Sequence, residues 1–343
     1  IASIKKKNAL TDVEGITVGH STAANAVCGV TVVICMEGAV AGVDVRGAAP
    51  GTRETDLLEP LNLVEKVQAV VLSGGSVFGL AASDGVVRWL YEKGIGFPLD
   101  DNQVAPIVPA AVLYDLGRGA QFVPPICAAW GKKACQSASA GPVDTGCVGA
   151  GTGALSGGIK GGLGMASLVT DSGLTVAALM AVNSLGSVID PENGRPWEIR
   201  LETNGEFGSQ GKRAVQVPKN GPPAPAQNTT IGVVATDAIL TKPEAQKIAQ
   251  MAQDGLARAI RPAHTMFDGD TIFCLATGKK ELPETPGFFT APHAQVLNEL
   301  GDAAANCVTR AIIHGVLNAS SLKGMVAFNE LKGRNQYKVL MTD

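Results

Sequence analysis

Asn228-Thr-Thr-Ile-Gly-Val-Val-Ala235 joins three polar residues to an apolar run that predicts a buried strand from Thr230 to Thr236. The stretch before it, Pro191 to Gln227, is polar, rich in Gly and Pro, and has little periodicity. We interpret that stretch as a linker. The junction therefore lies where a linker meets the core.

The bond between Asn228 and Thr229 has two interpretations. Asn and Thr often end loops because their side chains hydrogen-bond to the local backbone. Alternatively, the chain cuts itself at this bond, and Thr229 becomes the first residue of a second polypeptide. A terminal Thr carries both a hydroxyl nucleophile and a free amine that can act as its base. The remaining motifs have to decide between these interpretations.

Composition limits the class of protein. A chain of 343 residues can bury a large core, and its 45% hydrophobic but only 4% aromatic content predicts a core of Ala, Val, Leu and Ile. Gly accounts for 42 residues without any collagen-like period, which favours tight turns and close backbone contacts. The net charge of −3 makes nucleic acid an unsuitable partner.

Cysteine and histidine usage argues against disulfides and metal sites. The seven Cys residues are odd in number and lack CxxC spacing, so we predict reduced thiols in a cytoplasmic protein. We see neither a signal-peptide h-region nor an apolar run near 18 residues, and therefore expect no membrane span. The four His form no HxH or HExxH pattern, so we expect neither a metal, for which His264 is the available ligand, nor another cofactor.

The first half of the chain predicts strands, one helix and a glycine turn. Strands are predicted over 16–20, 28–35 and 39–45, joined by short loops and antiparallel, with a further buried strand over 67–72. Ser73-Gly-Gly-Ser76 then leads into a helix from Val77 to Lys93. A strand, a glycine turn and a helix start form a possible oxyanion cradle, so Ser73 and Gly74 are candidate substrate-binding residues.

The middle of the chain contains further polar residues near predicted turns. Lys160 stands alone in the glycine-dense stretch 148–164, which we interpret as a loop against a site although flexible linkers share its composition. A hairpin is predicted over 166–170 and 174–182, and Asn183 ends it either as a turn former or as an oxyanion donor. Tyr114, in an apolar run, is one of only three Tyr.

The last part predicts two helices, a strand and a carboxylate pair. Thr241-Lys-Pro-Glu244 is a capping box that opens a helix to Ile260, and a second helix is predicted over 291–317. Asp268-Gly-Asp270 precedes a strand over 271–276, and is either a plain turn or a pair of carboxylates that share a proton. Residues 325–328 and 337–340 are late strands or a tail.

In their order along the chain, six motifs carry a family resemblance that spans Leu10 to Leu317. They are Asp44-Val-Arg-Gly-Ala-Ala-Pro50, Leu72-Ser-Gly-Gly-Ser-Val-Phe-Gly79, Gly149-Ala-Gly-Thr-Gly153 with Lys160, Ala181-Val-Asn183, Asn228-Thr-Thr230 and Asp268-Gly-Asp-Thr271. The chain resembles the self-processing N-terminal-nucleophile aminopeptidases, which include the L-aminopeptidase/D-esterase, the β-peptidyl aminopeptidases and the nylon-oligomer endohydrolase. The β-aminopeptidase branch uses a Ser nucleophile and a Ser-x-Glu pair. This chain has Thr229 and the pair Asp268-x-Asp270 instead, and in this respect it is similar to the nylon-hydrolase branch.

The resemblance implies an α+β fold, an αββα sandwich of two mainly antiparallel sheets between helix layers. It implies one domain cut into an α chain, residues 1–228, and a β chain, residues 229–343, with αβ units that assemble into a homotetramer or larger oligomer. It assigns Thr229 as nucleophile, Asn183 to the oxyanion side, Lys160 and Tyr114 to the pocket, and Asp268 and Asp270 to the support of the nucleophile.

The resemblance implies hydrolysis of peptide-like amides through an acyl-enzyme, and three substrate classes remain open: short peptides, amino-acid amides and linear aminohexanoate oligomers. An acyltransferase of the ornithine acetyltransferase type would use the same self-made Thr and pass the acyl group to an amine. A non-enzymatic binding protein is the third possibility, and a single uncut chain would favour it.

Overall fold

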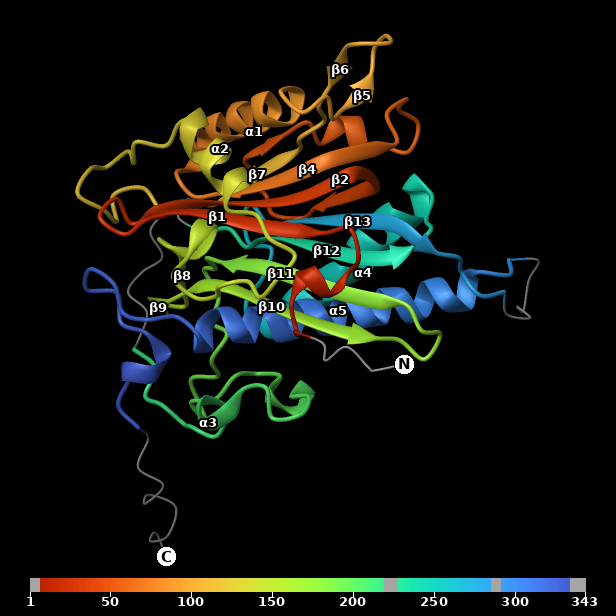
Figure 1. Ribbon diagram of the computed structural model, residues 1–343. Coiled ribbons are helices and arrows are strands. Elements are labelled where there is room, and N and C mark those ends of the chain that lie inside the picture. Colours follow the sequence, from red (N-terminus) through yellow and green to blue (C-terminus); the bar gives the residue numbers. More distant parts are fainter. Residues whose placement is uncertain (1–6, 219–227, 285–290, 334–343) are drawn as a thin grey trace, which may run out of the picture.

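A nine-stranded sheet forms the middle of the molecule in the part of the chain that the computed structural model describes, residues 7–218, 228–284 and 291–333 (Figure 1). Its strands are β1 (Thr17–Ala23), β2 (Cys28–Val45), β3 (Thr52–Arg53), β4 (Lys66–Ser73), β7 (Ala110–Val112), β10 (Gly162–Val169), β11 (Thr175–Val182), β12 (Ile231–Ala238) and β13 (Thr271–Lys280). They follow in the order β10-β11-β12-β13-β2-β4-β7-β3, with β1 paired to β2. Only β12–β13 and β4–β7 are parallel pairs in this sheet, so the mainly antiparallel prediction is confirmed.

Helices cover both outer faces of the strands (Figure 1). The helices are α1 (Ala82–Tyr91), α2 (Ala128–Gln136), α3 (Gly208–Gly211), α4 (Lys242–Ala259) and α5 (Ala294–Leu317). Short 3-10 turns are η1 (Leu10–Asp12), η2 (Asp56–Leu58), η3 (Ser76–Ala81), η4 (Gly149–Gly151), η5 (Ile199–Leu201) and η6 (Phe328–Glu330). Two small ladders pair β5 (Phe97–Pro98) with β6 (Val104–Ala105) and β8 (Leu155–Ser156) with β9 (Ile159–Lys160).

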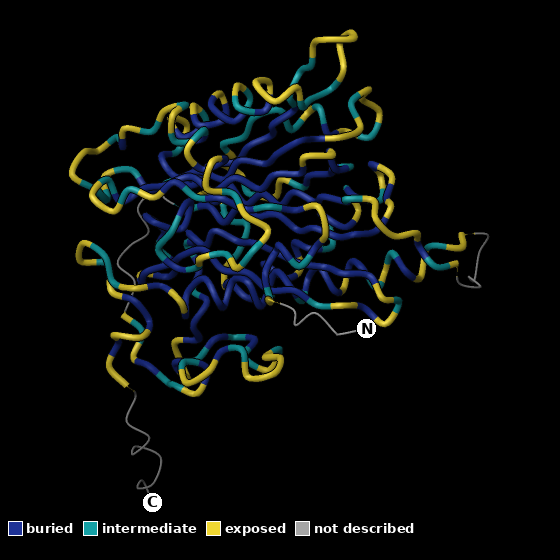
Figure 2. Tube along the Cα trace, in the orientation of Figure 1, coloured by how far each residue is buried: buried dark blue, intermediate teal, exposed yellow. Residues whose placement is uncertain are grey.

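Three hydrophobic cores separate four layers. One core lies between α1–α2 and the sheet, a second lies between two stacked parts of the sheet, and a third lies between the sheet and α4–α5. In β4, Ala69 and Val71 belong to the first core, whereas Val70 and Leu72 belong to the second. This period of two is what a strand with both faces buried requires, and each fully buried Val or Leu contributes about 1.5–3 kcal/mol. The predicted helix–sheet–sheet–helix layering is confirmed, and Figure 2 shows the strands as the most deeply buried part.

The two stacked parts of the sheet are joined by β2. Its first half, Cys28–Ile34, pairs with β1, and its second half, Val40–Val45, pairs with β13. The prediction of two strands over 28–35 and 39–45 was therefore wrong, because Met36-Glu37-Gly38 continues the strand instead of turning. The pairing with β4 shifts register in this stretch, and Gly38 has a φ of 74°, so β2 passes from one layer to the other as a single strand.

One other prediction needs correction, and one helix was missed. The helix predicted from Val77 begins as the 3-10 turn η3, because Gly75 and Ser76 both have positive φ values, and it becomes α-helical at Ala82. The helix α2 was not predicted. Its buried face consists of the small residues Gly131, Ala134 and Cys135, which give only a weak apolar pattern. Gly85 and Gly131 bring α1 and α2 into close contact, and a Cβ on Gly85 would lie 1.7 Å from the carbonyl oxygen of Ala128.

The described part of the predicted linker, residues 191–218, is packed on the protein. Phe207 is buried, and the carboxylate of Glu206 forms an ion pair with Arg310 (2.6 Å) and a hydrogen bond with His314 (3.0 Å) of α5. The segment lies beside α5 in Figure 1. The prediction of an unpacked linker was therefore wrong for these residues, while 219–227 lie outside the described residues.

Near the chain ends the outcomes are mixed. The capping box of Thr241 and Glu244 is confirmed at the start of α4, and α5 begins at Ala294 near its predicted start. Residues 325–328 form no strand of the sheet and lead into η6, and 337–340 lie outside the described residues. Among the helices of the described ranges, none has both the length and the apolar character that crossing a bilayer requires.

Candidate active site

Thr229 lies two residues before β12, between the ends of the two strands that flank β12. Because β11 is antiparallel to β12, the residue that follows β11, Asn183, lies beside Thr229. Because β13 is parallel to β12, the segment that precedes β13, Asp268 to Asp270, lies on the other side. The topology therefore brings three of the predicted motifs to one edge of the central strands.

Both polar groups of Thr229 are held. Its backbone N–H donates to the main-chain oxygen of Asn183 at 2.5 Å, and its Oγ1 accepts from the N–H of Gly269 at 3.2 Å. The same hydroxyl donates to the carbonyl oxygen of Asn228. Thr229 is only 5% exposed, so these contacts are made away from bulk water. The nucleophile predicted from the sequence is thus in contact with the carbonyl group of the bond predicted to be cut.

The side chain of Asn183 connects several loops. Its Oδ1 accepts from the guanidinium of Arg118 at 2.5 Å and from the N–H of Leu155 at 3.0 Å. Its Nδ2 donates to the main-chain oxygen of Tyr114 at 3.1 Å. The residue is fully buried, so the amide is held in one orientation beside Thr229.

Lys160 is also fully buried and belongs to the same set of loops. Its Nζ donates to three main-chain oxygens, those of Gly151 at 3.1 Å, Ala154 at 2.9 Å and Gly161 at 2.7 Å. Burial lowers the pKa of Lys160 to about 8, and the charge of Arg118 also acts to lower it. An amine with a pKa near neutrality can exchange a proton with a reacting group.

We expect this lysine to make stability depend on pH. Between its folded pKa of about 8 and its ordinary value of 10.5, the unfolded chain holds one more proton than the folded chain. The free energy of unfolding should therefore rise with pH through this window, by about 3 kcal/mol in total, relative to a Lys160→Met variant. Thermal unfolding of both proteins at pH 7.5, 9 and 10, each on a Thr229→Ala background so that neither is cut, measures the difference. Lys212→Met removes an exposed lysine as a control, and a constant difference between wild-type lysine and methionine would contradict the expectation.

The two carboxylates flank Gly269 from opposite sides. Asp270 Oδ1 accepts from the N–H of Thr230 at 2.8 Å, and Asp268 Oδ1 accepts from the N–H of Leu185 at 3.5 Å. Burial and the charge of Asp270 raise the pKa of Asp268 above its ordinary value. Both causes favour the protonated form of Asp268, because each makes its negative charge more costly.

The remaining predicted residues lie one step further from Thr229. Tyr114 is half-buried and reaches the site through its main-chain oxygen. Ser73 is fully buried, and its hydroxyl donates to the carbonyl oxygen of Gly74 at 2.9 Å. Gly74 lies against the carboxylate of Asp115, which a Cβ on this glycine would approach to 2.3 Å. In the hydrogen bonds of the described residues, neither Ser73 nor Gly74 contacts Thr229 or Asn183.

Sequence reasoning did not assign a role to Arg118 or Asp115. Arg118 donates to the main-chain oxygen of Gly153 at 2.7 Å as well as to Asn183, and Asp115 Oδ1 accepts from the N–H of Gly75 at 2.6 Å. Burial raises the pKa of Asp115. The only sequence signal for these residues was a charged pair around the glycine turn that follows the apolar run ending at Tyr114.

Gly153 shows how closely the loops are packed. A Cβ there would lie 2.3 Å from the main-chain oxygen of Val27 and 2.5 Å from Asp115 Oδ2. We expect Gly153→Ala to lower the free energy of unfolding by about 1–3 kcal/mol, because the backbone has to move to make room. Chemical denaturation measures this loss, and Gly333→Ala, whose Cβ would meet no atom of the described residues within 4 Å, is the control. Equal stability of both variants would contradict the packing argument.

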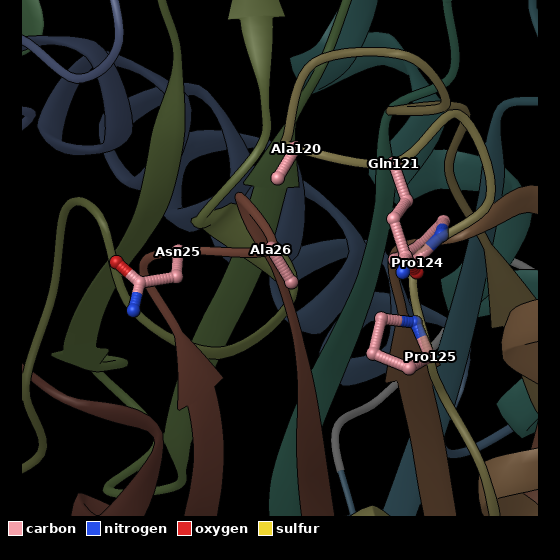
Figure 3. A pocket seen from close by; sticks show the side chains of 6 residues that line it. All are labelled: Asn25, Ala26, Ala120, Gln121, Pro124 and Pro125. Atoms are coloured by element: carbon pink, nitrogen blue, oxygen red, sulfur yellow. The ribbon is translucent and has the colours of Figure 1, made fainter.

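An apolar pocket adjoins the loop that carries Arg118. Asn25 and Ala26 from the β1–β2 turn line one side. The other lining residues, from the loop between β7 and α2, are Ala120, Gln121, Pro124 and Pro125 (Figure 3). Its volume is about 210 Å³. The two loops are in close contact, since a Cβ on Gly119 would lie 2.2 Å from the main-chain oxygen of Ala26. Hydrocarbon parts of small ligands bind in hollows of this kind.

Comparison with known proteins places this chain in a family. The profile of peptidase family S58 matches residues 8–328. An uncharacterized aminopeptidase of Mycobacterium tuberculosis is 46% identical over 342 residues, which cover 94% of this chain and 98% of the relative. A 6-aminohexanoate-oligomer endohydrolase of Kocuria sp. is 29% identical over 289 residues, which cover 80% of this chain and 77% of that enzyme. The solved L-aminopeptidase D-Ala-esterase/amidase of Ochrobactrum anthropi, a variant of the Ntn hydrolase fold, superposes with a TM-score of 0.70 at 24% identity, covering 95% of this chain and 90% of that one.

Proposed function

Because the chain belongs to peptidase family S58 and is a hydrolase of peptide or other amide bonds, we propose that it makes its own nucleophile, Thr229, by cutting the bond after Asn228. The observation that supports this proposal best is the position of the Thr229 hydroxyl. It contacts the carbonyl oxygen of Asn228, while the backbone nitrogen of Thr229 is held by Asn183.

In the proposed maturation, Thr229 Oγ1 attacks the carbonyl carbon of Asn228. The C–N bond breaks, the nitrogen of Thr229 takes up the proton of the hydroxyl, and an ester joins Asn228 to Oγ1. Water then hydrolyses the ester, which leaves a carboxylate on Asn228 and a free amine on Thr229. The N–H of Gly269 already donates to Oγ1, and it would stabilise the negative charge that develops on Oγ1 as this atom gives up its proton.

In the proposed turnover, the freed amine acts as the base for its own hydroxyl. Oγ1 attacks the carbonyl carbon of a substrate amide, the amine fragment leaves with a proton, and the acyl-enzyme is hydrolysed by water. The main-chain oxygen of Asn183 would keep the amine in place, and its side-chain amide would serve the oxyanion side. Lys160 would act in proton exchange, and Asp268 and Asp270 would support the nucleophile.

The proposal divides the chain into residues 1–228 and 229–343, both of which contribute strands to the single αββα domain. The central pair β11–β12 spans the cut, since β11 precedes it and β12 follows it. We further propose that these αβ units assemble into a homotetramer or larger oligomer in the cytoplasm.

For substrates, we propose short linear amides: small peptides, amino-acid amides or aminohexanoate oligomers. The relatives support this class, because the names of those matched above include an aminopeptidase, an L-aminopeptidase with esterase and amidase activity, and an endohydrolase of 6-aminohexanoate oligomers. Tyr114, Ser73 and Gly74 are the proposed substrate-binding residues.

Intact mass spectrometry followed by a substrate panel tests the proposal. We expect two polypeptides, the smaller beginning at Thr229, and hydrolysis by the matured protein of at least one amide among amino-acid p-nitroanilides, β-peptides and aminohexanoate oligomers. An added amine acceptor distinguishes acyl transfer from hydrolysis by its product. An active protein that remains one chain, or whose smaller fragment begins elsewhere, would rule the proposal out.

A further inference from the structure

The segment between α4 and β13 contacts both carboxylates beside the nucleophile. Its residue His264 has a φ of 55°, a left-handed conformation that only a few per cent of non-glycine residues adopt. This conformation directs consecutive residues to different partners, since His264 binds Asp270 and Thr265 binds Asp268. Sequence reasoning considered His264 only as a metal ligand and gave Thr265 no role.

Thr265 makes two hydrogen bonds to one oxygen. Its N–H donates to Asp268 Oδ2 at 2.9 Å, and its hydroxyl donates to the same atom at 2.6 Å. Asp268 is only 2% exposed, so these bonds replace much of the water that a carboxylate would otherwise bind. Hydrogen bonds from Thr265 oppose the rise in the pKa of Asp268 that burial and the charge of Asp270 produce.

His264 holds the second carboxylate. Its backbone N–H donates to Asp270 Oδ2 at 3.1 Å, and its ring Nδ1 lies 2.9 Å from the same oxygen. The other oxygen, Oδ1, accepts from the N–H of Thr230, the residue after the nucleophile. Asp270 therefore connects the imidazole ring to the backbone at the start of β12.

Few charged groups face Asp268 and Asp270 among the described residues. Asp268 faces Asp270, and Asp270 faces His264. The backbone N–H of Arg46 donates to the main-chain oxygen of Asp270, while the guanidinium of Arg46 forms an ion pair with Asp44 at 2.8 Å. The hydrogen bonds from His264 and Thr265 are therefore the direct side-chain support that the two carboxylates have within the described residues.

We propose that His264 and Thr265 are positioning residues, which hold the carboxylates of Asp270 and Asp268 beside Thr229, and that the Thr265 hydroxyl favours the ionised form of Asp268. The catalytic part of this inference rests on the proposed function. Hydrogen bonds to an ionised group are stronger than neutral ones, so losing the Thr265 hydroxyl weakens the support of the ionised carboxylate more than that of the protonated one.

Thr265→Val removes the hydroxyl and retains both the shape and the backbone N–H. We expect kcat of the matured enzyme to fall about tenfold with KM little changed, and the acid limb of the kcat profile to move to higher pH, because ionised Asp268 loses a donor. Thr265→Ser, which restores the hydroxyl, should return both quantities toward wild type. Thr277→Val is the matched control, since Thr277 bonds to the main-chain oxygen of Thr236 and contacts neither carboxylate.

For His264, the informative pair is His264→Asn and His264→Gly. Asn and Gly both accept the positive φ at this position, but only Asn places a side-chain N–H where Nδ1 of the His264 ring lies. We expect Asn to retain kcat within about threefold and Gly to lower it about tenfold, with processing of the precursor slowed in the same order. Equal rates for Asn and Gly would show that the ring nitrogen does not position Asp270.

A readout without activity separates this inference from the proposed function. On the uncut Thr229→Ala background, the destabilisation caused by Thr265→Val should increase as the pH rises from 4 to 7, because only ionised Asp268 misses the donor. Thr265→Ser should show no such increase. If the destabilisation by Thr265→Val increases with pH but the wild type is inactive and uncut, Thr265 supports Asp268 and the proposed function is refuted. If the destabilisation is the same at every pH and the pH profile of kcat does not shift, the inference is refuted and the proposed function is unaffected.

Discussion

Replacing Thr229 by Ala is expected to leave a folded protein of one uncut chain that hydrolyses no amide above the blank. The hydroxyl that contacts the carbonyl oxygen of Asn228 is lost, so the ester cannot form and no amine is released. Loss of a nucleophile typically lowers kcat by about 10⁵–10⁶-fold. Gel electrophoresis and intact mass report the cut, and a fluorogenic or p-nitroanilide assay reports turnover. The fold should persist, because the strand pairs of β12 do not involve this side chain.

Two neighbouring variants control this result. Thr229→Ser retains the hydroxyl and should be cut and active. Thr230→Val removes a hydroxyl that is buried and has no hydrogen-bond partner among the described residues, so it should be processed like the wild type. Processing and activity in Thr229→Ala at the wild-type level would exclude Thr229 as the nucleophile.

Replacing Asn183 by Ala is expected to raise the barrier of the chemical step by about 3 kcal/mol, or about a hundredfold in kcat, if its amide donates to the oxyanion. Because such a donor acts mainly in the transition state, kcat and kcat/KM should fall together. The substitution also removes the acceptor of Arg118 and of the N–H of Leu155. Stability therefore has to be measured alongside activity.

Asn183→Asp separates the two contributions. It retains the shape and an acceptor for Arg118 and Leu155, but places a carboxylate oxygen where Nδ2 now donates to Tyr114. We expect Asp to lose as much activity as Ala while losing less stability, since the hydrogen bonds from Arg118 and from the N–H of Leu155 keep an acceptor. Full activity of the Asp variant would remove the amide from the mechanism.

Individual strands could be predicted because both of their faces are buried, whereas the layered arrangement was implied by the family resemblance. The continuous apolar runs of β11 and β12 and the capping box of α4 each carry a local signal that tertiary packing reinforces. By contrast, the continuity of β2 was missed. Met36-Glu37-Gly38 has the composition of a turn, and only its pairing with β4 on either side of a register shift keeps it in the strand.

The candidate site was partly predictable for a similar reason. Thr229, Asn183 and the Asp268–Asp270 pair stand at strand ends, where polar residues next to apolar runs are conspicuous. Arg118 and Thr265 stand in irregular loops, where no periodicity marks them. Their contacts with Asn183 and Asp268 depend on how distant loops fold against each other, and the sequence around each residue carries no trace of that.

The central place of β12 has a consequence for any engineering of this protein. Six residues of β12 are hydrogen-bonded in register to β11, and its other edge is hydrogen-bonded to β13. Strands β12 and β13 both follow residue 229, and they lie between β11 and β2, which belong to residues 1–228. A fragment 229–343 synthesised separately would therefore have to insert this strand pair between two strands of the larger fragment to complete the sheet. One continuous polypeptide keeps the pair covalently attached to those strands while the sheet forms.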